Sequence, residues 1–244
     1  MTDFAGKRIW IIGASSGIGE ALARAFAAEG ARLILSARNE AALDELAEKC
    51  GGARVIALDL GQSGALADAI SRLDPDPLDA VICTAAMYEP TRVAAIDPAV
   101  AEQLVRVNVL GMIEVGRLCP KLLRNGGQLV LFGSVAGYVG LRGGQPYSAT
   151  KAAVNNLAET LAVELSPAID VRLVCPGFVR SRLTDKNDFK MPAIISADEA
   201  ASHVLRGLKR RGFEIHFPRR FTLAMKLLRM LPYALSLKLT RRLG

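Results

Sequence analysis

Short apolar runs that alternate with segments of helical periodicity constrain this chain more than any other feature. Nearly continuous apolar runs of this length are typical of strands that are covered on both faces. Strand–helix alternation along the chain requires parallel pairing with right-handed crossovers. The sequence therefore predicts an α/β fold, a doubly wound parallel sheet flanked by helices on both faces. The predicted strands are 8–12, 32–36, 54–58, 80–84, 128–132, 171–174 and 213–217, and the predicted helices are 17–29, 40–49, 63–72, 100–123, 146–165 and 197–210.

The composition is that of one domain in a reducing compartment. The chain has 244 residues, of which 51% are hydrophobic, enough for a large core. It shows no secretory signal and no apolar run of the roughly 18 residues that a membrane span needs. Its four cysteines are scattered and its two histidines lie apart, which favours reduced thiols and excludes a zinc site. We expect a cytoplasmic protein without a metal.

A glycine-rich turn follows the first predicted strand and opens the first predicted helix. It reads Gly13-Ala14-Ser15-Ser16-Gly17-Ile18-Gly19. Backbone N–H groups and the positive end of the helix dipole make such a place attract phosphate. Glycine allows positive φ and lets a pyrophosphate approach more closely than a Cβ would permit. The spacing G-x-x-x-G-x-G differs from the usual G-x-G-x-x-G fingerprint, so the turn alone is ambiguous.

The same turn contains Gly13-x-Ser15-x-Gly17, the nucleophile-elbow pattern of α/β-hydrolases. That interpretation needs an acid and then a histidine on later loops. His203 falls in a predicted helix and His216 in a predicted strand, and no strand precedes the turn to supply an oxyanion hole. The hydrolase interpretation is therefore disfavoured.

A serine, a tyrosine and a lysine late in the chain complete a constellation. Ser134 lies thirteen residues before Tyr147, and Lys151 follows the tyrosine by four. A phenol has an ordinary pKa near 10, so it needs help to exchange protons at neutral pH. Lys151 lies one helical turn away, and its positive charge would favour the phenolate. Tyr147 could then donate or accept a proton at a carbonyl or alcohol oxygen.

Polar residues follow the predicted strands where each strand ends. In an open α/β sheet, ligands collect beyond the carboxyl ends of the strands. The predicted strands end at or near Gly13, Arg38, Asp59, Thr84, Ser134 and Pro176. We expect these residues to face one cleft.

Together these motifs, in this order, resemble the short-chain dehydrogenase/reductase family over about residues 5–218. The fold that this implies is Rossmann-type, followed by a helical extension over 219–244. The activity it implies is hydride transfer between a nicotinamide cofactor and a carbonyl or secondary alcohol. The implied catalytic residues are Asn108, Ser134, Tyr147 and Lys151, with Asn108 in a proton relay to Lys151 and Lys151 also on the nicotinamide ribose. The implied cofactor contacts are Gly13, Ser15, Ser16, Gly17, Ile18, Gly19, Arg38, Asp59, Leu60, Ala85, Tyr147, Lys151, Pro176, Gly177, Val179 and Ser181.

The end of the second strand decides between the two nicotinamide cofactors. NAD enzymes usually place an acid there for the ribose hydroxyls. This chain has Ala37 at that position, followed by Arg38, whose guanidinium suits a 2′-phosphate. We expect NADP(H) to be preferred over NAD(H), and therefore reduction of a carbonyl substrate.

Two positions depart from the family pattern. Ile12 stands where a threonine is usual, and Cys83-Thr84-Ala85-Ala86 stands where Asn-Asn-Ala-Gly is usual. In the family these places exchange hydrogen bonds. Because Ile12 offers no hydroxyl, we interpret the pair of changes as one structural substitution.

The C-terminal segment concentrates the positive charge of the chain. Residues 206–244 hold eleven Lys or Arg and one acid, a net of +10 against +7 for the whole chain. Residues 219–231 also have a broad apolar face with cations beside it. Such a helix binds an anionic bilayer at the inner membrane surface, packs on its own domain, or covers the pocket of a dimer mate. Interleaved aromatic side chains are absent, so nucleic acid is not expected.

We expect the partner to be a small carbonyl or alcohol substrate, with residues 179–193 as the cap of its pocket. The resemblance also implies a homodimer or homotetramer through the helices near 100–123 and 146–165. Two other functions stay open, a non-catalytic NADP(H)-binding protein and a membrane-associated scaffold.

Overall fold

The computed structural model describes residues 3–187 and 191–241 and contains one seven-stranded sheet. All strand pairs are parallel, in the order β3-β2-β1-β4-β5-β6-β7. The strands are β1 (Arg8–Ile12), β2 (Arg32–Ser36), β3 (Arg54–Val55), β4 (Leu78–Cys83), β5 (Leu123–Phe132), β6 (Ile169–Pro176) and β7 (Glu214–Phe217). The doubly wound parallel sheet expected from the sequence is confirmed.

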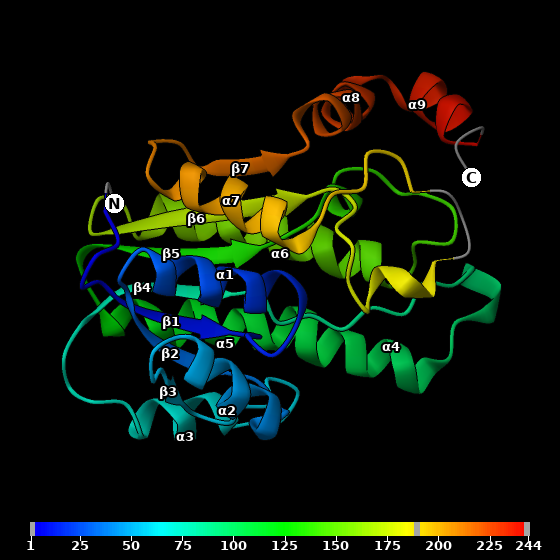
Figure 1. The fold of residues 1–244 in the computed structure, drawn as a ribbon. Coiled ribbons are helices and arrows are strands. Elements are labelled where there is room, and N and C mark those ends of the chain that lie inside the picture. Colours follow the sequence, from blue (N-terminus) through cyan, green and yellow to red (C-terminus); the bar gives the residue numbers. More distant parts are fainter. Residues whose placement is uncertain (1–2, 188–190, 242–244) are drawn as a thin grey trace.

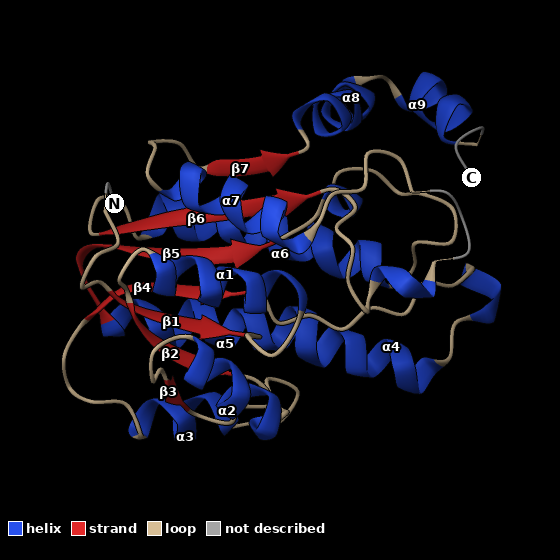
Figure 2. Ribbon diagram, in the orientation of Figure 1, coloured by secondary structure: helices blue, strands red, loops and turns tan. Residues whose placement is uncertain are grey.

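Helices cover both faces of the sheet (Figures 1 and 2). One apolar layer lies under α1 (Gly17–Ala28), α2 (Glu40–Lys49) and α7 (Ala197–Leu208). The opposite layer lies under α3 (Ala65–Ser71), α5 (Gly111–Leu118) and α6 (Tyr147–Glu164). Within β1, Ile9 and Ile11 belong to the first layer and Trp10 and Ile12 to the second, as the period of two along a strand requires.

Three predicted elements differ from the structure by more than two residues at one end or are divided into several helices. The third strand is regular only over Arg54–Val55, although the Ile56 and Leu58 N–H groups still donate to carbonyl oxygens of the β2 segment. The fifth strand begins five residues earlier than predicted. The predicted helix 100–123 consists of α4 (Pro98–Val105), a π-helical segment over Arg106–Leu110, then α5 and a 3-10 turn.

The C-terminal extension is helical, as expected, and consists of α8 (Arg219–Met230) and α9 (Tyr233–Thr240). Pro232 separates the two helices. In Figure 1 both stand beyond the edge strand β7, on the side of the sheet to which the strands point. Among the described residues, no helix combines the length and the apolar character that a bilayer crossing requires.

Candidate active site and family

The glycine-rich turn lies between β1 and α1 and is shaped by close backbone contacts. Gly13 has a φ of +94°, and a Cβ there would lie 2.5 Å from the Ala85 nitrogen. A Cβ on Gly19 would lie 2.1 Å from the carbonyl oxygen of Gly13. Gly17 also has positive φ, and its Cβ position faces Ser181 across the cleft at 3.4 Å. The turn thus closes on itself and on the segment after β4 only because Gly13 and Gly19 carry no side chain, and Gly17 is favoured by its positive φ.

The N-terminus of α1 differs from those of α2, α4 and α7, because its N-cap residue, Ser16, makes no side-chain capping bond. Ser16 is exposed, at the mouth of the turn. The first N–H groups of a helix lack intrahelical partners and are satisfied by caps, water or ligands. An uncapped helix start beside three glycines fits a phosphate group.

Thr84, the residue after β4, stabilises the turn through hydrogen bonds of its side chain. Its hydroxyl lies 3.1 Å from the carbonyl oxygen of Ile12 and 3.0 Å from that of Gly13. The Ile12 side chain is buried in the apolar layer. The Thr84 hydroxyl therefore adds a side-chain hydrogen bond to those that the backbone N–H groups of Thr84 and Ala85 also donate to the Ile12 carbonyl, and this agrees with a structural substitution.

The remaining predicted cofactor contacts lie along the same edge of the sheet. Arg38 is exposed just after β2 and makes no ion pair with any residue that the structure describes. Asp59 accepts a hydrogen bond from the Gly61 N–H at 2.9 Å, which fixes its carboxylate. Pro176 ends β6, and the Ser181 N–H donates to the Thr184 hydroxyl at 2.9 Å. Ser15, Ile18, Ala85 and Gly177 are half-buried, and Leu60 and Val179 are buried.

Tyr147 and Lys151 occupy one face of the first turns of α6. The Lys151 ammonium lies 5.7 Å from the centroid of the Tyr147 ring. It donates a hydrogen bond of 2.7 Å to the carbonyl oxygen of Phe132, the last residue of β5. Burial lowers the pKa of Lys151 to about 8. The end of the neighbouring strand therefore holds this cation beside the phenol.

Burial raises the pKa of Tyr147 above its ordinary value, a hydrogen bond with Ser134 opposes that shift, and the neighbouring Tyr88 adds to it. The lowered phenol pKa that we expected from Lys151 is not seen in this structure, because removal from water outweighs the hydrogen bond with Ser134. Tyr147 is a protonated phenol at neutral pH, the form that donates a proton.

Ser134 is positioned by the loop after β5 and by α6. Its hydroxyl accepts a bond from the Ala136 N–H at 3.1 Å. The Ser148 hydroxyl, one residue after Tyr147, donates to the Ala136 carbonyl at 2.6 Å. A Cβ on Gly137 would lie 2.7 Å from the Lys151 backbone, so a glycine is needed for this loop to rest on α6. Ser134 and Tyr147 are thus brought together from segments thirteen residues apart.

Asn108 lies fully buried in the π-helical segment. Its side-chain oxygen accepts a hydrogen bond from the Met87 N–H at 2.7 Å. Its side-chain nitrogen donates to the Met87 carbonyl at 2.8 Å and to the Thr150 hydroxyl at 3.0 Å. Single π turns inside helices are frequent at functional sites, and here the turn aims an amide at α6. The structure thus brings Asn108 to the first turn of α6, where it contacts Thr150, the residue before Lys151.

Sequence analysis missed the second tyrosine of the site. The Tyr88 ring meets the Tyr147 ring edge-on, with centroids 4.7 Å apart and planes at 87°. Its hydroxyl donates to Asn187 at 2.6 Å, which ties the loop after β4 to the capping segment. The only available signal was its position four residues after the strand-end Thr84. Residues 188–190 of the expected cap lie outside the described residues.

Residues 7–191 match the short chain dehydrogenase family. The chain is a short-chain dehydrogenase/reductase. It is therefore an oxidoreductase of a family that uses a nicotinamide cofactor. The glycine turn and the uncapped start of α1 fit the phosphates of such a cofactor.

Known proteins of this family cover most or all of the chain. An uncharacterized oxidoreductase of Myxococcus xanthus is 30% identical over 253 residues, which cover all of both chains. An 11-beta-hydroxysteroid dehydrogenase A of Sesamum indicum is 35% identical over 195 residues, 75% of this chain and 55% of the relative. The structure of a short-chain dehydrogenase from Sphingobium yanoikuyae in complex with NADPH has a TM-score of 0.78 and 28% identity, and the match covers 93% of this chain and 97% of that one.

Proposed function

We propose that this short-chain dehydrogenase/reductase reduces a carbonyl compound with NADPH and that Tyr147 donates the proton. The observation that carries the proposal is the protonated, half-buried phenol held between Ser134, Lys151 and Tyr88. A general acid must hold its proton at the working pH and reach the reacting oxygen. Tyr147 meets the first requirement through its burial and the second through its place beside Ser134.

The nicotinamide ring supplies the hydride when the cofactor is bound. The chain's own residues would hold the other reactant. The Ser134 hydroxyl would hydrogen-bond to the carbonyl oxygen, and the Tyr147 hydroxyl would give that oxygen its proton. Lys151 would offset the negative charge left on the phenol, because its ammonium already lies 5.7 Å from the ring. Asn108 would keep the start of α6 in place through Thr150.

Preference for NADP(H) rests on Arg38. Its guanidinium is exposed beyond β2, beside the N-terminus of α2, and has no acidic partner among the described residues. A free guanidinium matches the charge and geometry of a 2′-phosphate. The described NADPH-bound relative from Sphingobium yanoikuyae supports the same cofactor.

Self-association through the helices on one side of the sheet is a further expectation. Val105, Leu110 and Ile113 are exposed by 41%, 50% and 42% along α4, the π-helical segment and α5. An exposed apolar row of this kind favours a contact between copies of the chain.

The test is oxidation of NADPH and of NADH by wild-type protein across a panel of aldehydes and ketones. We expect turnover with NADPH on at least one class, and a loss of about 100-fold in kcat in Ser134→Ala, because one hydrogen bond to the reacting oxygen disappears. Tight NADPH binding without turnover on any carbonyl class would contradict the proposal and favour a cofactor-binding protein.

A further inference from the structure

Helix α8 has apolar side chains on two opposite faces. The inner face buries Thr222, Met225 and Leu228 against the domain. The outer face presents Leu223, Leu227 and Met230, which are exposed by 54%, 62% and 80%. Their i, i+4, i+7 spacing forms a continuous stripe. A surface helix of a globular domain normally points polar residues outward, so the outer stripe indicates a contact outside the described chain.

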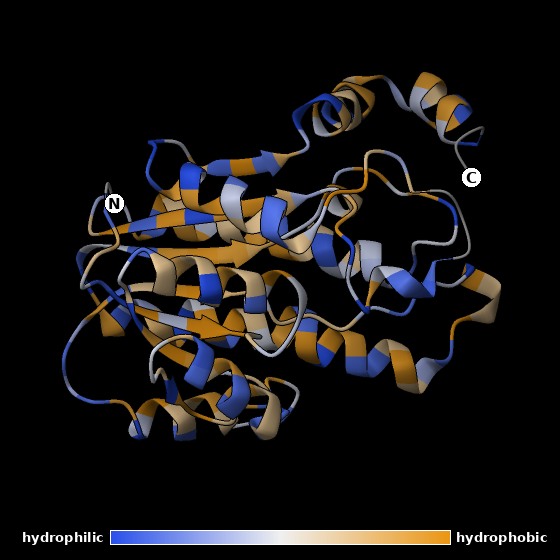
Figure 3. Ribbon diagram, in the orientation of Figure 1, coloured by the Kyte–Doolittle hydropathy of each residue, from blue (hydrophilic) through white to orange (hydrophobic). Residues whose placement is uncertain are grey.

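Helix α9 also exposes apolar side chains, and its buried side chains are polar. It buries Ser236 and Thr240 and exposes Tyr233 by 83%, together with Leu235, Leu237 and Leu239. Figure 3 shows apolar residues along the ribbon of both helices. The exposed apolar side chains of the two helices are here called the α8–α9 face.

Helix α8 is firmly attached, because its inner side contacts the domain at several points. The Phe221 ring packs on Phe178 with centroids 5.8 Å apart. A Cβ on Gly177 would lie 2.9 Å from the Phe221 ring. Lys226 binds Glu214, which also accepts a bond from the Tyr138 hydroxyl. The outer stripe is therefore held in a fixed orientation.

Cations surround the apolar stripe. Arg219, Arg220 and Arg229 are exposed on α8, and Lys238 is exposed on α9. Glu214, the one acid in residues 206–244, is already occupied by Lys226 and Tyr138. The face thus combines exposed leucines with uncompensated positive charge.

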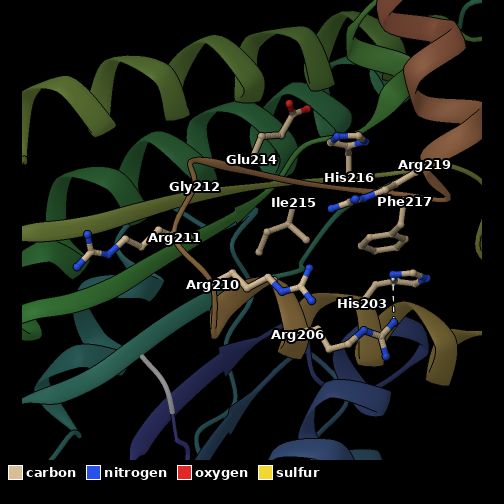
Figure 4. A pocket seen from close by; sticks show the side chains of 11 residues that line it. His203, Arg206, Arg210, Arg211, Gly212, Glu214, Ile215, His216, Phe217 and Arg219 are labelled. Atoms are coloured by element: carbon tan, nitrogen blue, oxygen red, sulfur yellow. Dashed lines mark hydrogen bonds between the residues drawn. The ribbon is translucent and has the colours of Figure 1, made fainter.

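A basic cleft adjoins α8 at the edge of the sheet (Figure 4). It lies between α7 and β7 and has a volume of about 270 Å³. Four arginines line it, and none of them forms an ion pair with a described residue. They are Arg206, Arg210, Arg211 and Arg219.

We propose that the α8–α9 face docks on an anionic lipid bilayer. Leu223, Leu227 and Met230 of α8 would enter the boundary between headgroups and acyl chains, Tyr233 would lie at headgroup level, and the arginines of α8 and of the basic cleft would bind lipid phosphates. A second copy of the chain fits this face less well, since it would bring two segments of net charge +10 together. The docking does not depend on the reaction proposed for the site.

The test is co-sedimentation of the full chain with vesicles of phosphatidylcholine alone and of phosphatidylcholine with 30% phosphatidylglycerol. We expect at least tenfold stronger binding to the anionic vesicles, weakened by salt. The variant Leu223→Ser/Leu227→Ser/Met230→Ser should lose at least tenfold in binding and keep its thermal unfolding midpoint, because all three side chains are exposed. Val163→Ser is the matched control, an 80% exposed apolar residue on α6 that should leave binding unchanged.

Equal binding of wild-type protein and the triple variant to anionic vesicles would overturn the proposal. So would a wild-type dimer, seen by light scattering, that the triple variant converts to a monomer while neither protein binds lipid. That second result would assign the α8–α9 face to another copy of the chain.

Discussion

The two halves of the site are built on different principles. The cofactor half, around β1, α1 and β2, relies mainly on backbone, that is, on three glycines and an uncapped helix start, together with one exposed arginine side chain. The proton-transfer half, at the start of α6, relies on buried side chains that bond to one another and to strand ends. The comparison teaches that cofactor binding in the first half should depend mainly on backbone geometry, whereas the reaction in the second half should depend on which side chains are present. The predictions below test this division.

Lys151→Met should separate activity from stability. We expect kcat to fall by about 10³, since the charge beside the phenol is lost. Folding should become more stable at pH 7 by about 1–3 kcal/mol, because burial disfavours the ammonium and lowers the pKa of Lys151 to about 8. Chemical denaturation measures the second effect.

The pH dependence of that stability difference has a definite sign. The folded pKa of Lys151 is depressed from its ordinary 10.5, so the destabilising effect of its burial is fully present below about pH 8 and disappears as the pH approaches 10.5. The unfolding free energies of wild-type protein and Lys151→Met should therefore converge as the pH rises over that range. A variant less stable than wild-type protein at pH 7 would contradict the account.

Gly19→Ala should disrupt the cofactor half through steric contacts alone. The added methyl would meet the Gly13 carbonyl at 2.1 Å and the Thr84 hydroxyl at 2.7 Å. We expect NADPH binding to weaken by at least 100-fold and unfolding to need about 2–4 kcal/mol less. Fluorescence titration and thermal unfolding measure the two effects. Gly140→Ala, where a Cβ has no neighbour within 4 Å, is the control and should change neither.

Arg38→Ala should change cofactor choice and leave the chemistry intact. We expect the Kd for NADPH to rise by about 10- to 100-fold, while the Kd for NADH stays within about threefold, since a charge-assisted contact to phosphate is lost. The kcat at saturating NADPH should be unchanged. Equal weakening of both cofactors would show that Arg38 acts on the fold and not on the 2′-phosphate.

Two serine substitutions give the smallest effects and compare two helix starts. Ser196 caps α7 in a capping box with Glu199, so Ser196→Ala should cost about 1 kcal/mol of unfolding free energy. Ser16 makes no cap on α1, so Ser16→Ala should leave stability unchanged and weaken NADPH binding only. A loss of stability in Ser16→Ala similar to that in Ser196→Ala would remove the distinction between these helices.

Much of this division could be predicted from the sequence. Apolar runs and glycine spacing predicted the sheet, the turn and the position of Tyr147 beside Lys151, because these depend on local periodicity and on strand ends. The contacts of Asn108 in the π-helical segment could not be predicted, since they join it to Met87 and Thr150, which are distant in sequence.

Three further features depend on contacts that no local pattern encodes. The raised pKa of Tyr147 follows from burial by several elements, which no local pattern encodes. Tyr88 became part of the site only because the loop after β4 turns toward α6. The bond between Glu214 and Lys226, which fixes α8, likewise joins residues twelve positions apart.

The most direct test of the central claim, that Tyr147 donates the proton, is single-turnover oxidation of bound NADPH by a carbonyl substrate. Tyr147→Phe removes the hydroxyl, while Tyr88→Phe removes the hydroxyl of the tyrosine whose ring meets Tyr147 edge-on and serves as the matched control. We predict that Tyr147→Phe binds NADPH as wild-type protein does and turns over at least 10³-fold more slowly, while Tyr88→Phe loses less than about tenfold. A Tyr147→Phe rate within tenfold of wild-type protein, with NADPH fully bound, would contradict the account.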